Sequence, residues 1–356
     1  MTNAKKLPLI ISIIALLSFI TSAKAEIKVV TSIKPIHSLV SYVMDGVGTP
    51  DLIVDGFNSP HNFQLKPSHA KMLENADIIF WIGEGLENFL EKPLDSISKN
   101  AKKVELMEVK GINKLEFREK NIFAEHDHDE HKHEEDGHKE EEHDEHEHEE
   151  HEHEEDGHKE EEHDEHEHEE DGHKEEKHDD HDGHDDHGHG EHDPHIWLDP
   201  QNAKVIVKLI TKELSELDSK NAPTYKKNSE KALSDLDKLI KKVKKDTSKD
   251  LRFVVFHDAY HYYEDRFGIS LLGALTVNPD VLPGAAQLVE IREVIEHEKV
   301  NCIFSEPQFN PDIIKSIAKD TGVKTGVLDP LGANLDKGKN LYFDLIKNIS
   351  SSFKGC

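Results

Sequence analysis

Hydrophobic residues gather in short, β-branched runs that alternate with helical patterns along most of the chain. Before residue 125 we expect strands at 27–30, 52–54 and 78–81 and helices at 37–44 and 68–75. After residue 250 the alternation resumes, with expected strands at 253–256, 302–304 and 325–328 and helices at 283–298 and 311–320. Such alternation is typical of parallel sheets flanked by helices. The pattern predicts an α/β fold with two lobes, at residues 26–124 and 250–356.

The segment between these lobes, residues 194–249, is almost free of strand signals. In its second half, apolar residues recur every three or four positions, at Tyr225, Ala232, Leu236, Leu239, Ile240 and Val243. This spacing predicts an amphipathic helix of about six or seven turns. We therefore expect one long, rigid helix to join the two lobes.

The first 25 residues have the pattern of a secretory signal peptide. Lys5 and Lys6 precede an apolar run over 9–20, and Ala23-Lys24-Ala25 is typical of a cleavage site before Glu26. An uncleaved anchor helix is the alternative, but the run is short for a bilayer span. No other segment is apolar enough to cross a membrane, and no lipidation cysteine follows the cleavage site. We expect a soluble, monomeric protein of a Gram-negative periplasm, without stable membrane insertion.

The charge of the chain is concentrated in one insert at residues 125–193. The 356 residues carry a formal net charge of −30, and the insert holds 37 acidic residues, five lysines and no hydrophobic residue. The insert alone therefore carries −32, and the rest of the chain carries +2. No basic patch is large enough to collect phosphates, so the composition argues against nucleic-acid binding.

The insert also contains 21 of the 28 histidines, and residues 131–150 recur almost unchanged at 151–170. Because this repeat has no apolar side chain to pack, we expect it to be disordered without metal. Imidazole favours Zn²⁺, Cu²⁺ and Ni²⁺, so the insert should offer many weak metal sites. The alternative is a solvated acidic segment, which would explain the carboxylates but not the histidines.

Three of the other histidines occupy positions suited to a binding site. His61 is in a loop after an expected strand, His195 stands where the insert gives way to a helix, and His257 ends an expected strand. The carboxyl ends of strands are where α/β folds place ligand groups. Spacing alone does not show that the three side chains converge.

The chain has two cysteines, Cys302 in an expected strand and Cys356 at the C-terminus. Cysteines of exported proteins are usually paired, so we expect a disulfide that ties the C-terminus to the sheet. The alternative is two unrelated thiols.

Six segments in order carry a family resemblance: SPHNFQLKPS (59–68), HIWLDP (195–200), FHDAYHYYE (256–264), VNPDVLPGA (277–285), SEPQF (305–309) and LDPLG (328–332). Together they resemble the zinc-binding proteins of the ZnuA type, which are periplasmic solute-binding components of zinc ABC transporters. The resemblance runs from about residue 26 to residue 356 and includes the histidine-rich insert and the two late cysteines.

The resemblance implies that His61, His195 and His257 bind Zn²⁺ in a cleft between the lobes. Asp329 matches an aspartate that is a ligand in manganese-type relatives. Some relatives have an acidic residue directly before the first ligand histidine, but this chain has Pro60, so the fourth ligand is expected to be Asp329 or water. Three neutral imidazoles suit Zn²⁺ better than Mn²⁺.

The resemblance further implies delivery of Zn²⁺ to an inner-membrane ABC permease, by a protein that is not an enzyme. One alternative is a periplasmic zinc buffer that stores metal in the insert, and another is a manganese- or iron-type binding protein of the same family. A zinc hydrolase would use a similar set of histidines, but no HExxH pattern or obvious general base accompanies them.

Metal binding by the insert should weaken as the pH falls, because a protonated imidazole has no lone pair for a metal ion. The ordinary histidine pKa is about 6.5, so we expect fewer Zn²⁺ ions per chain at about pH 5.5 than at about pH 7.5. Equilibrium dialysis at the two pH values measures this stoichiometry. Equal values would contradict the prediction and favour the solvated acidic segment.

Overall fold

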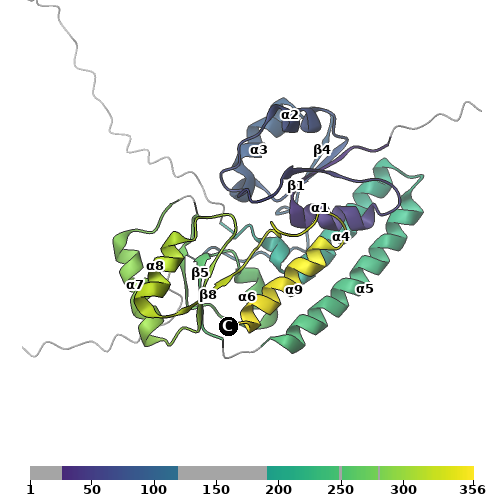
Figure 1. Cartoon of the computed structure of the whole chain (residues 1–356). Coiled ribbons are helices and arrows are strands. Elements are labelled where there is room, and N and C mark those ends of the chain that lie inside the picture. The colour runs from purple at the N-terminus through teal and green to yellow at the C-terminus, as the bar shows by residue number, and fades with distance from the viewer. Residues whose placement is uncertain (1–25, 119–190, 248–250, 280) are drawn as a thin grey trace, which may run out of the picture. The chain divides into compact units, whose positions relative to one another are not determined.

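The computed structural model describes residues 26–118, 191–247, 251–279 and 281–356. The expected signal peptide and all but the last three residues of the predicted insert lie outside these ranges. The described chain contains two parallel sheets flanked by helices (Figure 1). The predicted two-lobed α/β fold is therefore confirmed.

The N-terminal lobe has a four-stranded parallel sheet in the order β2-β1-β3-β4. Its elements are β1 (Val29–Ile33), α1 (Lys34–Val43), β2 (Asp51–Val54), α2 (Pro67–Glu74), β3 (Ile78–Trp81), α3 (Glu84–Ser96) and β4 (Lys102–Glu105). Every residue of β1 and β3 is buried. Central strands of a parallel sheet are covered on both faces, which explains why they are continuous hydrophobic runs.

The C-terminal lobe repeats this strand order as β6-β5-β7-β8. Its elements are β5 (Phe253–His257), α6 (His261–Phe267), β6 (Gly273–Thr276), α7 (Ala285–His297), β7 (Cys302–Ser305), α8 (Asp312–Thr321) and β8 (Lys324–Val327). Phe253 and Val255 belong to one hydrophobic cluster, and Val254 and Phe256 belong to another. Successive side chains of a strand point to opposite faces, so β5 has hydrophobic packing on both sides.

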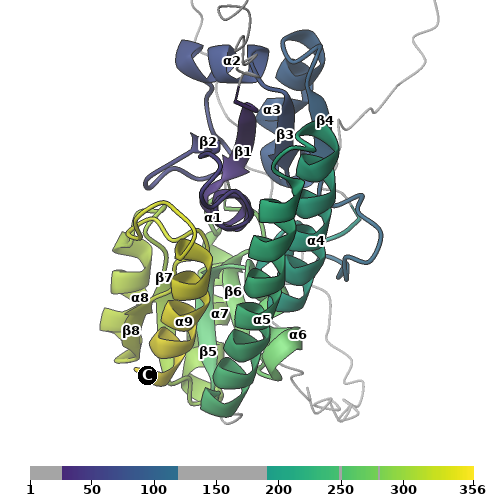
Figure 2. The same cartoon turned by 90° about the vertical axis from the view of Figure 1, so that its right-hand side faces the viewer.

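Helices α4 (Pro200–Leu217) and α5 (Ala222–Asp246) connect the lobes and pack against each other (Figure 2). The 25 residues of α5 correspond to the long amphipathic helix predicted from the apolar spacing. Its buried side chains include Tyr225, Ala232, Leu236, Leu239 and Val243. The predicted periodicity therefore corresponds to the face that joins the core.

A further helix that the pattern did not predict, α9 (Leu341–Lys354), contacts both lobes. Near its start, the Tyr342 backbone N–H donates to Ser38 Oγ of α1 at 2.9 Å. Near its end, the Phe353 ring lies 4.8 Å from the Phe253 ring of β5, measured between centroids. The lobes are thus joined by more than the one helix expected.

The segment between β8 and α9 also joins the lobes. Lys34, which is buried at the start of α1, donates to the carbonyl oxygens of Ala333 and Leu335 at 3.1 and 2.7 Å. Lys337 forms a 2.9 Å ion pair with Asp55 in the loop after β2. Burial lowers the pKa of Lys34, although nearby carboxylates oppose this shift.

Five elements were not predicted from the sequence: α3, β4, α6, β6 and α9. Strand β4 reads Lys-Lys-Val-Glu and lies at the edge of its sheet, so it lacks a hydrophobic run. Strand β6 has only four residues, beginning with Gly273. Their positions depend on pairing with neighbouring strands, which local hydrophobic patterns do not record.

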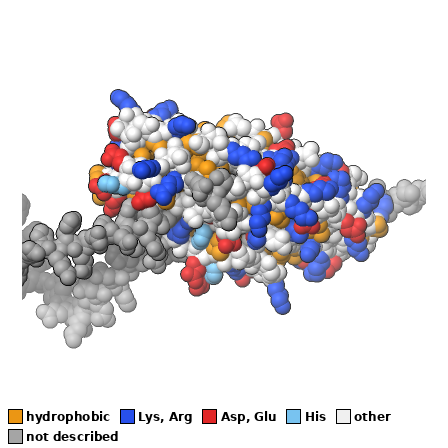
Figure 3. Space-filling view, turned by 90° about the horizontal axis from the view of Figure 1, so that it is seen from below, with side chains coloured by type: hydrophobic (Ala, Val, Ile, Leu, Met, Phe, Trp, Pro, Cys, Tyr) orange, Lys and Arg blue, Asp and Glu red, His pale blue; other side chains and the backbone are white. Residues whose placement is uncertain are grey.

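On the face seen in Figure 3, lysine and arginine side chains are mixed with acidic ones. This agrees with the small net charge calculated for the chain outside the insert. Within the described ranges, no helix is both long and apolar enough to cross a bilayer.

Cys302 and Cys356 form a disulfide, which confirms the predicted pairing. Cys302 is the first residue of β7 and is fully buried. The bond closes a chain segment with a sequence separation of 54 residues, so it holds the end of α9 on the C-terminal sheet.

Loss of this disulfide should destabilise the protein by about 4 kcal/mol, because the unfolded chain regains the entropy of an open 54-residue loop. Denaturant unfolding of the oxidised and reduced protein measures the difference. Cys356→Ser should resemble the reduced protein and should not respond further to reductant. Equal stability of the oxidised and reduced forms would contradict this prediction.

Candidate metal centre

His61 lies in the loop that follows β2 on the N-terminal lobe. Gly56, the second residue of this loop, has φ 71°, a backbone conformation that residues with a Cβ disfavour. The His61 backbone N–H donates to Ser59 Oγ at 3.2 Å, and Pro60 restricts the conformation of Ser59. The loop thus presents the imidazole at the carboxyl end of a parallel strand.

His195 lies between the end of the insert and α4. The η2 turn (Ile196–Leu198) follows it directly, and Asp199 then caps the N-terminus of α4. Arg266 of α6 holds the Asp199 carboxylate through two hydrogen bonds of 2.6 Å. The Trp197 indole donates to the carbonyl oxygen of Pro330 at 2.8 Å. These contacts fix the turn that carries His195.

His257 is the last residue of β5, a central strand of the C-terminal sheet. It pairs with Thr276 of β6, and its side chain is 3% exposed. The strand therefore places the imidazole at the same kind of sheet edge that carries His61 on the other lobe.

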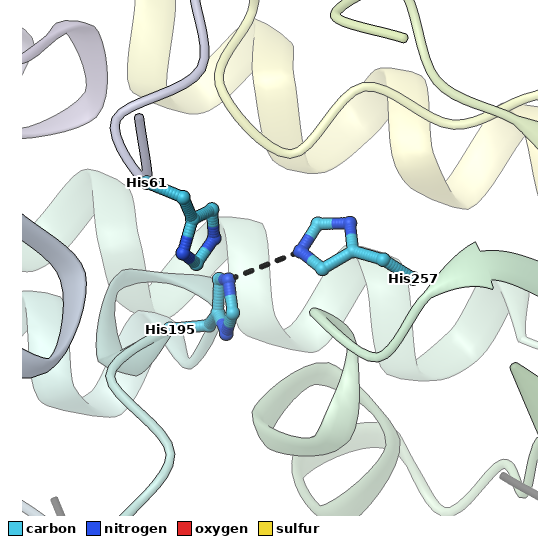
Figure 4. A group of neighbouring side chains, drawn as sticks. All are labelled: His61, His195 and His257. Atoms are coloured by element: carbon cyan, nitrogen blue, oxygen red, sulfur yellow. Dashed lines mark hydrogen bonds between the residues drawn. The ribbon is translucent and has the colours of Figure 1, made fainter. Parts of the chain in front are cut away.

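The three histidines converge, which their sequence spacing could not establish (Figure 4). One ring nitrogen from each lies within 4.8 Å of the other two. The ring centroids are 5.2 to 5.6 Å apart. A cavity of about 10 Å³ adjoins them, which is about the space that one water-sized particle requires.

Buried carboxylates orient two of the three rings. Asp193 Oδ1 lies 2.7 Å from His195 Nδ1 and also accepts the His195 backbone N–H at 2.9 Å. Glu306 Oε1 lies 2.8 Å from His257 Nδ1. A carboxylate that accepts from Nδ1–H fixes the tautomer, so the lone pair of Nε2 faces the centre.

The Nε2 atoms of His195 and His257 lie 3.3 Å apart. If both Nδ1 atoms carry their protons toward carboxylates, two lone pairs meet there, and only a shared proton or a cation relieves their repulsion. Burial, and then the neighbouring His257, holds the pKa of His195 well below its usual value. Burial alone would lower the pKa of His257, but Glu306, with Asp258 and Asp193, raises it.

This arrangement fits Zn²⁺. Tetrahedral zinc with Zn–N distances of about 2.0–2.1 Å needs nitrogen atoms about 3.3–3.4 Å apart, and the observed Nε2–Nε2 distance is 3.3 Å. Three imidazoles, two of them with a carboxylate at Nδ1, are a donor set that divalent zinc favours over harder cations.

The structure does not bring Asp329 into this group of donor atoms. Its Oδ1 accepts from the Gln308 amide at 3.0 Å and from the backbone N–H groups of Leu331 and Gly332 at 3.1 and 2.9 Å. Its Oδ2 accepts from the backbone N–H of Ala333 at 2.6 Å. Asp329 therefore holds the loop after β8, which lines the cavity.

Asp193 is a site residue that the sequence did not reveal, because it ends a long run of acidic residues. We assigned it to the insert, but it is 2% exposed and Tyr262 donates to its carbonyl oxygen at 2.7 Å. Its backbone N–H donates to Leu115, next to the bridge between Glu116 and His192. The folded body therefore includes residues 191–193, and burial raises the pKa of Asp193 to about 7.

Arg118 also contributes to the site from the segment before the insert. Its guanidinium holds Asp258, next to His257, and Glu264 of α6 through contacts of 2.6 to 3.2 Å. Both chain segments that flank the insert thus contact residues beside the histidine cluster.

Residues 29–356 match the family described as ZnuA, the periplasmic component A of a zinc-uptake complex. The chain belongs to the ZnuA family. The resemblance carried by the six sequence segments is therefore confirmed, and ZnuA proteins are solute-binding components of transport systems.

Two relatives named high-affinity zinc uptake system protein ZnuA illustrate the match. The protein from Brucella abortus (strain 2308) is 47% identical over 330 residues, which covers 92% of this chain and 91% of that protein. The one from Haemophilus influenzae is 41% identical over 348 residues, 96% of each. A crystal structure of a zinc-bound ZnuA deletion mutant has a TM-score of 0.64 at 20% identity and covers 91% of this chain and 95% of that one. The last comparison shows a shared fold.

Asp193→Asn should weaken zinc binding by about 10- to 100-fold, because the neutral amide orients His195 less firmly and makes it a poorer ligand. Competition with a chromophoric chelator measures the dissociation constant. Asp237→Asn, on the exposed face of α5, is the matched control and should leave the affinity unchanged. An unaltered dissociation constant for Asp193→Asn would show that the carboxylate is dispensable.

Proposed function

We propose that this protein captures Zn²⁺ at His61, His195 and His257 and delivers it to an ABC permease in the inner membrane. The observation that carries the proposal is the convergence of three imidazole nitrogens within 4.8 Å. Membership of the ZnuA family supports zinc as the cargo and a transport complex as the destination.

The origin of the ligands suggests how zinc is released. His61 comes from the N-terminal lobe, His195 from the connecting segment and His257 from the C-terminal lobe. A small displacement of one lobe would separate the donor atoms, and the permease can promote release by binding that separated state more tightly. Capture and release then use the same three side chains.

Binding is a better account of this site than hydrolysis. A zinc hydrolase needs an open coordination position and a general base near the metal-bound water. The two carboxylates closest to the rings, Asp193 and Glu306, are engaged by His195 and His257. These contacts support a role for both carboxylates in orienting ligands.

We further propose that residues 1–25 are removed on export to the periplasm and that the insert assists zinc loading without forming the main site. Residues 126–187 lie wholly outside the described ranges, so their deletion removes none of the contacts described for the histidine cluster. A longer deletion of 125–193 would also remove Asp193 and so would disturb the cluster itself.

Each of His61→Ala, His195→Ala and His257→Ala should abolish the tight one-to-one zinc site, because two imidazoles cannot complete it. Isothermal titration of each variant in the background of the 126–187 deletion measures the site without the metal sites expected in the insert. The deletion alone should retain one tight Zn²⁺, whereas the zinc-buffer alternative requires that it lose tight binding. His297→Ala, an exposed residue of α7, is the control and should bind as the deletion does.

A further inference from the structure

The crossing segment, residues 329–340, connects β8 of the C-terminal lobe with α9. Two of its residues, Pro330 and Leu331, line the cavity beside the three histidines. The whole segment is described, and none of its residues lies in a helix or strand. Its position therefore depends on the contacts that it makes with other parts of the chain.

The most buried contact between the crossing segment and the N-terminal lobe is made by Lys34, the first residue of α1. Lys34 is 4% exposed, and its Nζ donates to the carbonyl oxygens of Ala333 and Leu335 at 3.1 and 2.7 Å. Lys337 and Lys339 also form ion pairs with this lobe, but their side chains are 50% and 45% exposed. Because exposed ion pairs contribute little, Lys34 is the contact expected to fix the segment.

Stability alone does not explain a lysine at position 34. The described hydrogen-bond partners of its ammonium group are carbonyl oxygens, not carboxylates. Burial lowers the pKa of Lys34, against the attraction of Asp55 and Asp329, so a charged side chain here costs free energy. Buried charges can often be replaced by apolar side chains without loss of stability. The lysine is better explained by the position that it gives to two backbone carbonyls.

Lys34 and the loop of His61 share one edge of the N-terminal sheet. Lys34 directly follows Ile33, the last residue of β1, and Ile33 pairs with Val54, the last residue of β2. The loop that carries His61 begins at the next residue, Asp55. Lys34 therefore binds the crossing segment at the sheet edge from which the loop of His61 departs.

The crossing segment also holds the turn that carries His195. The Trp197 indole donates to the carbonyl oxygen of Pro330 at 2.8 Å, and the Trp197 and His195 rings are 5.3 Å apart between centroids. Asp329, which follows β8, accepts from the backbone N–H of Ala333 at 2.6 Å. The peptide groups of one short segment thus contact the N-terminal lobe, the turn of His195 and the end of the C-terminal sheet.

Tyr342 of α9 makes a second connection between the N-terminal lobe and the turn of His195. Its backbone N–H donates to Ser38 Oγ of α1 at 2.9 Å, and its hydroxyl donates to the carbonyl oxygen of Trp197 at 2.7 Å. Because this connection does not involve Lys34, loss of the lysine should loosen the arrangement without abolishing it.

We propose that Lys34 is a positioning residue for zinc binding. Through the crossing segment it sets the place of His61, on the N-terminal lobe, relative to His195 and His257. Ligands that are already held in the binding geometry lose less freedom when the metal binds, and so they bind it more tightly. This inference rests on the proposed zinc site.

The test compares Lys34→Met with the unsubstituted protein, both in the background of the 126–187 deletion. Loss of two charge-assisted hydrogen bonds should raise the zinc dissociation constant by about 10-fold, mainly through faster release. Stopped-flow transfer of Zn²⁺ to a chromophoric chelator measures the release rate. Lys339→Met is the matched control: it removes an exposed ion pair between the same segment and the same lobe, and it should leave the dissociation constant nearly unchanged.

A double substitution separates positioning from general destabilisation. If Lys34 acts by placing His61, Lys34→Met should have no further effect once His61→Ala has removed that ligand. A competing dye of micromolar affinity measures the weak Zn²⁺ binding that His195 and His257 retain. Equal weakening in both backgrounds would overturn the proposal, as would unchanged or tighter binding by Lys34→Met alone.

Lys34→Gln is the second variant, and it decides the matter if Lys34→Met does not fold. Its side chain keeps an N–H donor but is uncharged and shorter, so it should weaken zinc binding in the same direction. Failure of the proposed function has a different signature, because His61→Ala would then retain tight binding. If only this inference is wrong, the histidine variants lose tight zinc binding while both Lys34 variants bind as the 126–187 deletion does.

Discussion

The hydrogen bonds between buried carboxylates and two histidine rings are the interactions on which the candidate metal centre depends. Asp193 and Glu306 face the Nδ1 atoms of His195 and His257, so the two Nε2 lone pairs point at each other across 3.3 Å. That separation is unfavourable for two neutral acceptors and suits two ligands of one tetrahedral cation. The geometry of the site therefore suits a bound cation.

The rest of the fold brings the three ligands together from different parts of the chain. His61 and His257 lie at the carboxyl ends of strands in two sheets with the same strand order, and His195 lies in the connection between them. Helices α5 and α9 join the lobes, and the disulfide holds the end of α9 against β7. The contacts between lobes are mostly helical, so the sheet edges that carry the ligands remain at the cavity.

The negative charge of the chain is carried by the insert, whereas the face seen in Figure 3 mixes both signs. The two chain segments that flank the insert are nevertheless anchored beside the histidines, through Arg118 with Asp258 and through Asp193 with His195. The described residues on both sides of the insert therefore take part in contacts beside the cluster.

The sequence by itself determined the α/β class, the long helix α5, the cysteine pair and, through family motifs, the three histidines. These follow from local periodicity or from short motifs that stand together in the chain. The sequence did not distinguish Asp193 from the acidic run before it, and it did not predict the polar edge strand β4. Nor did it show that the Asp329 carboxylate accepts hydrogen bonds from backbone N–H groups. Those features arise from contacts between segments far apart in the chain. Only the tertiary structure decides these features. An aspartate that is buried beside a histidine and one that is exposed to solvent are the same residue in the sequence, and they differ only in burial and hydrogen-bond partners.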